Sequence, residues 1–265
     1  MFNWYLNLDI TYQVLLAGLF TWFFTALGAS IVFFFKKINN TVLDGMLGLA
    51  GGIMIAASFF SLLNPAIEGA EKIGLTPWLT IASGFIFGGM LLFLADIFFN
   101  KLFSNHNTSN TSLKRSAMLI SSITIHNIPE GLAIGVAFGS IAVSLEGATI
   151  SSALMLALGI AIQNFPEGTA VSLPLRRERF SRKNAFLYGA LSGIVEPISA
   201  VLGCILVTHV QNILPFLLAF AAGSMIYVVV SELIPESQKN NRKNLMTLFS
   251  IMGFVLMMVL DVALG

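Results

Sequence analysis

The chain has 265 residues, of which 56% are hydrophobic and only 10% are charged. Soluble domains carry roughly 25% charged residues, so this composition excludes an ordinary soluble domain and indicates a polytopic membrane protein. The formal net charge of +1 gives no reason to expect a nucleic-acid partner, and the single cysteine, Cys204, excludes an internal disulfide.

The apolar residues form eight runs, each close to the roughly 20 residues that a membrane-spanning helix needs. These expected spans are 10–35, 41–64, 77–99, 116–140, 149–173, 184–207, 212–234 and 245–264. Short polar segments separate them, so we expect one all-α, multi-pass domain over residues 1–265 in the cell membrane (plasma or inner membrane). The first run is longer than the apolar part of a signal peptide, about 7–15 residues, and is expected to be retained.

Lysine and arginine predict the orientation of the spans. With the N-terminus outside, every lysine and arginine except Lys72 falls on the cytoplasmic side. Positively charged residues in short loops are retained on that side of a membrane. With eight spans, this orientation makes both termini extracytoplasmic.

Two near copies of one motif lie within the fourth and fifth expected spans. They are H-N-I-P-E-G at 126–131 and Q-N-F-P-E-G at 163–168. Consecutive spans cross the membrane in opposite directions, so the shared N-x-P-E-G pattern indicates an inverted-topology repeat whose halves meet around a central site.

The motifs carry ionisable side chains into apolar helices, where each costs about 2.5–3.5 kcal/mol at the bilayer centre. His126 and Glu130 are four residues apart and therefore share one helix face, and Gln163 and Glu167 repeat that spacing. Such residues usually face the interior of a helix bundle and mark a site or pathway. The two motifs therefore predict one buried polar site.

Three more polar residues extend this site. Asn127 and Asn164 lie about 100° further round the same helices, and Glu196 lies within the sixth span beside Pro197. Imidazole suits zinc and iron, and carboxylate and amide oxygens suit harder ions, so the set should bind several divalent metals without sharp selectivity. The amides have an alternative role as hydrogen-bonding groups between helices.

At these residues the chain resembles the ZIP (Zrt/Irt-like) family of divalent metal transporters, particularly its GufA-like bacterial branch. The resemblance extends to A-S-F-F-S-L-L at 57–63 and S-E-L-I-P-E at 231–236, and covers essentially the whole chain. It implies transport of divalent transition-metal cations into the cytoplasm, zinc first, with iron, cadmium, manganese and cobalt as alternatives. The metal would be the substrate and not a cofactor, and the resemblance also implies a homodimer in the lipid bilayer.

The resemblance also implies particular metal ligands. The central site would comprise His126, Glu130, Gln163, Glu167 and Glu196. A second, adjacent site would use Asn127 and Asn164 with the bridging carboxylates Glu130, Glu167 and Glu196. Some relatives carry an acidic residue at the position of Asn164, so the second site is less charged here and its occupancy is an open question.

Five further residues are expected along the pathway. Met54, Ser58 and Ser61 form one stripe on the second span, which the resemblance places along the outer entrance; packing of small residues against a neighbouring helix is the alternative. Glu68 would attract cations outside the membrane or act as a solvated loop charge. Glu232, at the inner end of the seventh span, would be an exit ligand. The resemblance further implies that spans one, four, five and six move against the other four by alternating access.

Two other functions compete with this interpretation. An intramembrane metallohydrolase would use a signature such as H-E-x-x-H, which the sequence lacks, so we do not expect an enzyme. A transporter or channel for an organic ion or proton would use the acidic residues without metal. Metal-dependent quenching or protection at the site would distinguish metal transport from that alternative, because a transporter that uses no metal would show neither.

Overall fold

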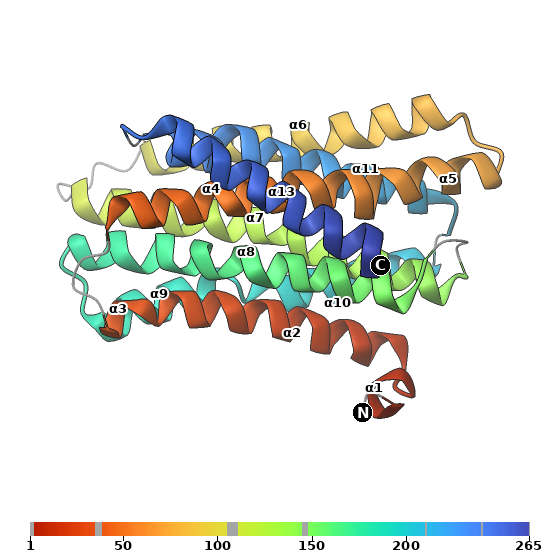
Figure 1. Ribbon diagram of the computed structural model, residues 1–265, viewed down its shortest axis with the longest axis horizontal. Helices are drawn as coiled ribbons and strands as arrows, with labels where there is room; N and C mark the ends of the chain where they lie inside the picture. The colour runs from red at the N-terminus through yellow and green to blue at the C-terminus, as the bar shows by residue number, and fades with distance from the viewer. Residues whose placement is uncertain are drawn as a thin grey trace.

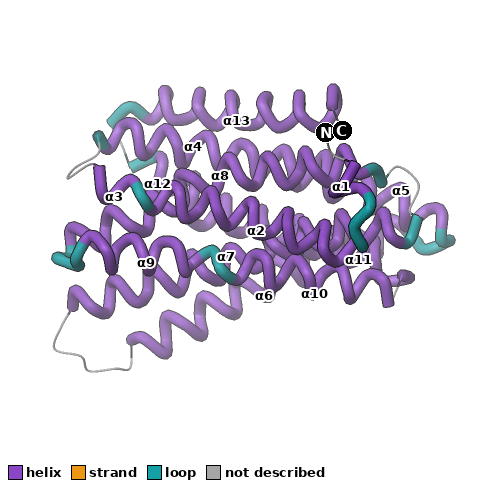
Figure 2. Tube along the Cα trace, turned by 90° about the horizontal axis from the view of Figure 1, so that it is seen from below, coloured by secondary structure: helices purple, strands orange, loops and turns teal. Residues whose placement is uncertain are grey.

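The computed structural model describes residues 3–34, 39–104, 111–144, 148–209, 211–239 and 241–264, and over these ranges its regular elements are all helices (Figure 1). Two of the residues used to predict orientation, Lys36 and Lys37, lie outside the described residues. The helices run lengthwise beside one another, and both chain ends lie toward the same end of the bundle (Figures 1 and 2).

The helices are bounded as follows. The first half of the chain forms α1 (Asn3–Leu6), α2 (Ile10–Ala29), α3 (Ile31–Phe34), α4 (Asn40–Ala57), η1 (Ser58–Leu63), α5 (Asn64–Lys72) and α6 (Pro77–Ser104). The central pair is α7 (Thr111–Ala142) and α8 (Ile150–Arg177). The remainder forms α9 (Arg182–Ser192), α10 (Val195–His209), η2 (Gln211–Ile213), α11 (Leu214–Val228), η3 (Val229–Leu233), α12 (Ile234–Ser237) and α13 (Lys243–Leu264).

Within the described residues, six helical segments are long and apolar enough to cross a membrane. They are Ile10–Phe34, Asn40–Lys72, Pro77–Phe98, Arg182–His209, Leu214–Ser237 and Lys243–Ala263. These match six of the eight expected spans. The other two correspond to α7 and α8, which have 32 and 28 residues but are less apolar because they contain the polar motifs. The chain is therefore a polytopic, all-helical membrane protein.

Four pairs of helices make the most extensive contacts: α7 with α10, α2 with α8, α4 with α13, and α6 with α11. Glycines allow the close approach of the first two pairs. A Cβ atom added at Gly168 on α8 would lie 2.0 Å from the carbonyl oxygen of Thr25, and one at Gly131 on α7 would lie 2.3 Å from that of Glu196. These contacts draw α2, α7, α8 and α10 together around the motif residues.

Four of the expected spans depart from a continuous α-helix. The first is interrupted at Ser30, between α2 and α3. The second and seventh contain the π-helical turns η1 and η3, followed by Pro65 and Pro235 respectively. The sixth is interrupted at Gly193 and Ile194, between α9 and α10. By contrast, α7 and α8 continue through Pro129 and Pro166. Interrupted helices at membrane depth are tolerated where the backbone is buried in protein or lines a water-filled cavity.

Candidate metal centre

The two motifs and Glu196 meet in the interior of the bundle, on α7, α8 and α10. The side chains of Asn127, Glu130, Gln163, Asn164, Glu167 and Glu196 are all buried. His126 occupies α7 one turn before Glu130, but its side chain lies outside the described part of the chain. The structure thus brings together the six described members of the expected centre.

Glu130 and Gln163 form the direct link between α7 and α8. The Nε2 atom of Gln163 donates a hydrogen bond of 2.7 Å to Oε1 of Glu130. The other oxygen of each side chain, Oε2 of Glu130 and Oε1 of Gln163, is buried without a hydrogen-bond partner among the described residues. Two adjacent side chains therefore each retain an oxygen that can bind a cation.

Glu196 is the second residue of α10, which begins directly after the interruption of the sixth span. Its backbone N–H donates to the carbonyl of Gly193 at 3.0 Å. Both carboxylate oxygens accept hydrogen bonds. Asn164 Nδ2 donates to Oε2 at 2.6 Å, and the Thr25 hydroxyl donates to Oε1 at 3.1 Å. Thr25 lies on α2 and belongs to none of the sequence motifs. Its detectable signal was the pair Thr21 and Thr25, one turn apart in the apolar middle of the helix.

Asn127 contacts the end of α9, on the N-terminal side of the interruption in the sixth span. Its Nδ2 atom donates a 2.9 Å hydrogen bond to the carbonyl oxygen of Ser192, the last residue of α9. That carbonyl lies where the helix stops, so the amide supplies a donor that the helix itself does not. Its own Oδ1 atom is buried without a described partner, as is Oδ1 of Asn164. Sequence reasoning singled out Asn127 but not the carbonyl that it caps.

The charge and the vacant oxygens of the centre suit a divalent cation. Glu130 is repelled by Glu167 and by Glu196, and burial of such carboxylates is unfavourable without a compensating partner. The four unpartnered oxygens, on Asn127, Glu130, Gln163 and Asn164, are ligand types that divalent cations accept. Among the described side chains, which leave out His126, no three His, Cys, Asp or Glu groups form a ready-made metal cluster. The centre is thus a mixed carboxylate and amide site.

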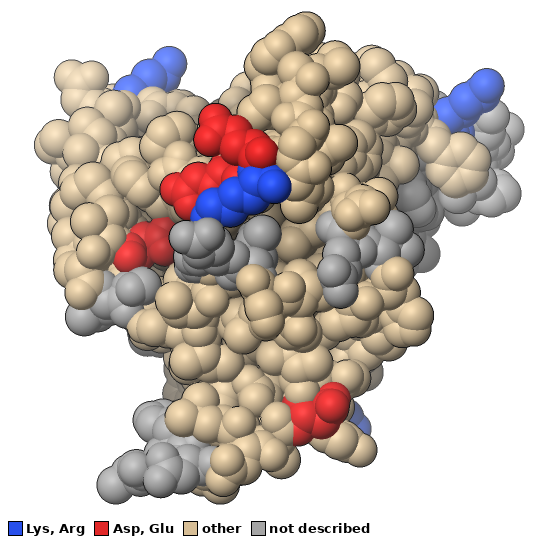
Figure 3. Space-filling view, turned by 90° about the vertical axis from the view of Figure 1, so that its right-hand side faces the viewer, with Lys and Arg blue, Asp and Glu red and all other residues tan. Residues whose placement is uncertain are grey.

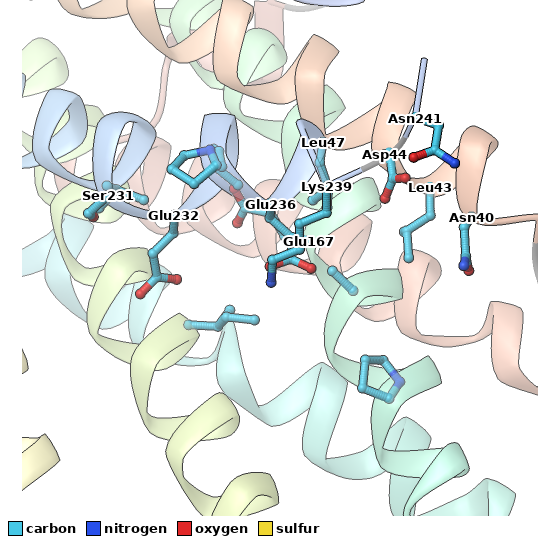
Figure 4. Close-up of a pocket in the computed structure, with 16 residues that line it drawn as sticks. Asn40, Leu43, Asp44, Leu47, Glu167, Ser231, Glu232, Glu236, Lys239 and Asn241 are labelled. Carbon is cyan, nitrogen blue, oxygen red and sulfur yellow. The ribbon is translucent and has the colours of Figure 1, made fainter. Parts of the chain in front are cut away.

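A cavity of about 820 Å³ leads from this centre toward one end of the bundle (Figure 4). Glu167 and Glu232 both line it, together with Ser231 on η3 and Asp44 on α4. Glu236 also lines it, and forms an exposed ion pair with Lys239. Glu232, expected as an exit residue, therefore lines the same cavity as Glu167 of the motif.

A smaller pocket of about 330 Å³ lies on the side of η1 and α5. Ser61 and Glu68 line it, and the Ser61 hydroxyl donates to Oδ2 of Asp261 at 3.0 Å. Glu130, Glu167 and Glu196 are not among its lining residues. Met54 and Ser58, expected on the same stripe as Ser61, are buried, and Ser58 donates to the carbonyl of Met54. The stripe therefore passes from a pocket into the protein interior.

The surface at that end of the bundle carries few charged groups. Figure 3 views the end that includes α5 and the chain termini. In its upper half acidic side chains gather around a basic side chain, and another acidic group lies apart near the bottom, on a mainly uncharged surface. Glu68 is exposed there. The pocket near this end is lined by none of the three buried glutamates, whereas Glu167 lines the larger cavity.

Comparison with known proteins gives consistent matches. The model of the ZIP zinc transporter family matches residues 104–261. Zinc transporter ZIP11 of Homo sapiens is 38% identical over 96% of this chain and 98% of its own length. Zinc transporter ZIPB of Bordetella bronchiseptica is 35% identical over 91% of this chain and 78% of its own, and zinc transporter GufA of Myxococcus xanthus is 34% identical over 95% and 98%.

Proposed function

Because this chain belongs to the ZIP zinc transporter family, we propose that it carries divalent transition-metal cations, zinc first, across a membrane. It is a transporter and not an enzyme, and the metal is its substrate. Iron, cadmium, manganese and cobalt are the alternative cargoes, because a mixed set of carboxylate, amide and imidazole ligands discriminates weakly among first-row ions.

We propose that the cargo binds at the buried centre, with Glu130, Gln163, Glu167 and His126 as its principal ligands. The observation that carries this assignment is the pair Glu130 and Gln163, which are joined by one hydrogen bond and each keep a buried oxygen without a described partner. A buried carboxylate oxygen left unpaired is costly, and a bound cation would remove that cost. Asn127, Asn164 and Glu196 adjoin these ligands.

The route from the centre follows the larger cavity. Glu167 belongs both to the motif and to the wall of this cavity, so the cavity adjoins the proposed centre. Glu232 lies on the same route, and the positive-inside pattern assigns this end to the cytoplasm. Movement of the cation into the cytoplasm is therefore the proposed direction. The pocket at Ser61 and Glu68 is the proposed outer entrance, with Met54 and Ser58 beyond it.

The proposed topology has eight spans with both termini outside the cytoplasm. Two facts support it: α7 and α8 are as long as the six apolar segments, and both chain ends lie at one end of the bundle. The inverted repeat is supported by the packing, since α2 with α8 corresponds to α10 with α7, and α4 with α13 corresponds to α11 with α6. The π turns η1 and η3 occupy corresponding spans.

The proposed location is the cell membrane. Large apolar side chains are exposed along α6 and α13, including Trp78, Phe87, Met252 and Val262, as expected of surfaces that face lipid. The homodimer rests on the family resemblance. Crosslinking in native membranes would test it, because a monomer gives no crosslinked pair from single cysteines introduced along α6.

The test of this function is zinc entry into sealed vesicles that contain the purified full-length chain and a trapped fluorescent zinc indicator. We expect a signal that rises with external zinc and saturates, and that competing manganese, iron, cobalt or cadmium reduces in an order the experiment would establish. Protein-free vesicles are the control. Equal signals with and without protein, for every metal, would contradict metal transport.

A further inference from the structure

Tyr227 and Asp96 form a hydrogen bond between α11 and α6, outside the buried centre. The Tyr227 hydroxyl donates to Oδ2 of Asp96 at 2.8 Å, and both side chains are partly buried. A carboxylate within an apolar span is unfavourable unless it is paired, and usually marks a functional feature. Neither residue belongs to the two repeated motifs or lines the larger cavity. The metal centre therefore gives no reason for an aspartate at this place.

The pair lies where α11 changes into the π turn η3. Tyr227 is the last residue but one of α11, and Val229 begins η3. The turn is closed by a hydrogen bond from the backbone N–H of Ile234 to the carbonyl of Val229. Ser231 and Glu232 lie on this turn and both line the larger cavity (Figure 4). Tyr227 is thus bonded to α6 directly before the segment that presents Glu232.

Close backbone packing holds α11 against α6 up to this point. A Cβ atom added at Gly223 on α11 would lie 2.0 Å from the carbonyl oxygen of Phe85 on α6. Elements packed this tightly have little freedom to shift against each other. Tyr227 lies one turn beyond Gly223, so its hydrogen bond to Asp96 extends the fixed interface to the start of η3.

The orientation of Tyr227 is tied to that of the cavity wall. Its neighbour Val228 lines the cavity, and the negative charge of Glu232 acts on the Tyr227 phenol. Consecutive residues of an α-helix are about 100° apart around its axis. A rotation that took Tyr227 away from Asp96 would therefore also turn Val228 and the residues of η3 relative to the cavity.

The other half of the fold contains the same arrangement. Asp261 on α13 accepts a hydrogen bond of 3.0 Å from Ser61, which lies on the π turn η1. Gly253 lies eight residues before Asp261, as Gly88 lies eight residues before Asp96. A Cβ atom added at either glycine would lie 2.0 Å from a backbone carbonyl oxygen of the partner helix. Each π turn is therefore accompanied by an aspartate on the helix that packs beside it.

We propose that Asp96, acting through Tyr227, is a positioning residue that holds η3 so that Glu232 faces the larger cavity. The inference rests on the proposed transport function and its route, and it adds two residues that lie outside the wall of that route. Because Asp96 does not line the cavity, it acts through the tyrosine and not as a ligand of the passing cation.

The test is zinc uptake into proteoliposomes by the full-length chain and its variants, measured at low and high salt per folded, incorporated protein. Tyr227→Phe and Asp96→Leu both remove the hydrogen bond. Uptake at low salt should fall roughly two- to tenfold in each, and the loss should shrink at high salt, as expected when a charge no longer faces the cavity. Asp96→Asn keeps an acceptor oxygen for the tyrosine and should restore uptake.

Combination with Glu232→Gln separates positioning from a general loss of stability. Once the Glu232 charge is removed, Tyr227→Phe should cause no further loss, because residues that act as one unit are not additive. Tyr5→Phe is the matched control, since it removes a buried hydrogen bond from a tyrosine to the carbonyl of Gln13, away from both described pockets. Any effect of this control should be independent of salt and equal with and without Glu232→Gln.

Three results would overturn the positioning role while leaving metal transport intact. The first is native uptake by Tyr227→Phe at low salt. The second is a loss in Tyr227→Phe that persists in full when Glu232→Gln is present. The third is equal loss in Asp96→Asn and Asp96→Leu, which would show that the charge of Asp96 matters and not its bond to the tyrosine. If native proteoliposomes take up no metal, the proposed function fails and this inference fails with it.

Discussion

Gln163 donates a hydrogen bond of 2.7 Å to Glu130 across the contact between α8 and α7, and each side chain keeps a second oxygen that is buried and has no described partner. The two residues come from equivalent helices of the two motif copies. A hydrogen bond between a neutral amide and a carboxylate orients both groups, but it uses only one of about four hydrogen-bonding positions on each. The hydrogen bond thus links the two helices while leaving one oxygen on each side chain for the proposed cation.

Gln163→Leu removes the donor to Glu130 while keeping a side chain of similar size. Glu130 then loses its described side-chain donor, and the free energy of unfolding of the metal-free protein should fall by about 1–3 kcal/mol. Thermal unfolding in detergent would measure this as a lower midpoint. An unchanged midpoint would mean that the bond contributes nothing. Gln238→Leu, which alters an exposed amide bonded to Thr247, is the control and should leave the midpoint nearly unchanged.

Zinc itself should stabilise the folded chain, because it binds the folded state through ligands that are separated after unfolding. At a free zinc concentration of 100 times the dissociation constant, the expected gain is about 2.7 kcal/mol. The unfolding midpoint of the native chain should therefore rise with zinc, whereas that of Glu130→Gln should rise much less. Equal rises in both proteins would place the stabilising zinc outside the buried centre.

Gly168→Ala tests the close contact between α8 and α2. The added Cβ atom would lie 2.0 Å from the backbone carbonyl of Thr25, so the helices must move apart, at a cost of about 1–3 kcal/mol or more. Gly89→Ala is a matched control, since its nearest neighbour would be 3.6 Å away, an ordinary contact. Denaturation of the two variants in the same detergent should show a large loss for Gly168→Ala only.

Glu232→Gln tests the route through the larger cavity. Removing a negative charge from a narrow space shared with Glu167 should lower the local concentration of cations, and zinc flux should fall roughly two- to tenfold at low salt. The difference should shrink as salt screens the charge. Glu236→Gln is the control, because Glu236 lies in an exposed ion pair with Lys239 and should contribute little. Equal fluxes for Glu232→Gln and the native chain at low salt would remove Glu232 from the route.

Much of the architecture was predictable because membrane spans leave a strong signal in composition. Six expected spans coincide with long apolar helices, and the two motif segments form long helices as expected. The burial of Glu130, Glu167 and Glu196 also agrees with the prediction. Ionisable side chains in apolar spans usually face the bundle interior, because their exposure to lipid is unfavourable.

The finer geometry was hidden from sequence reasoning for identifiable causes. The contact between Thr25 and Glu196 joins residues 171 positions apart, and no local pattern encodes such a pairing. The interruption at Gly193 lies four residues before Pro197, whose ring cannot donate to the Gly193 carbonyl and clashes with it, whereas α7 and α8 continue through Pro129 and Pro166. The turns η1 and η3 each add one residue per turn to an otherwise ordinary helical pattern.

The measurement that bears most directly on this account is the initial rate of radioactive zinc uptake into proteoliposomes made with native protein, Glu130→Gln and Glu236→Gln, each checked for folding and equal incorporation. We predict saturable uptake by the native chain, near-native uptake by Glu236→Gln, and uptake at the level of protein-free vesicles for Glu130→Gln. If folded Glu130→Gln moves zinc as fast as the native chain, the buried centre between α7 and α8 is not the transport site, and the central claim is wrong.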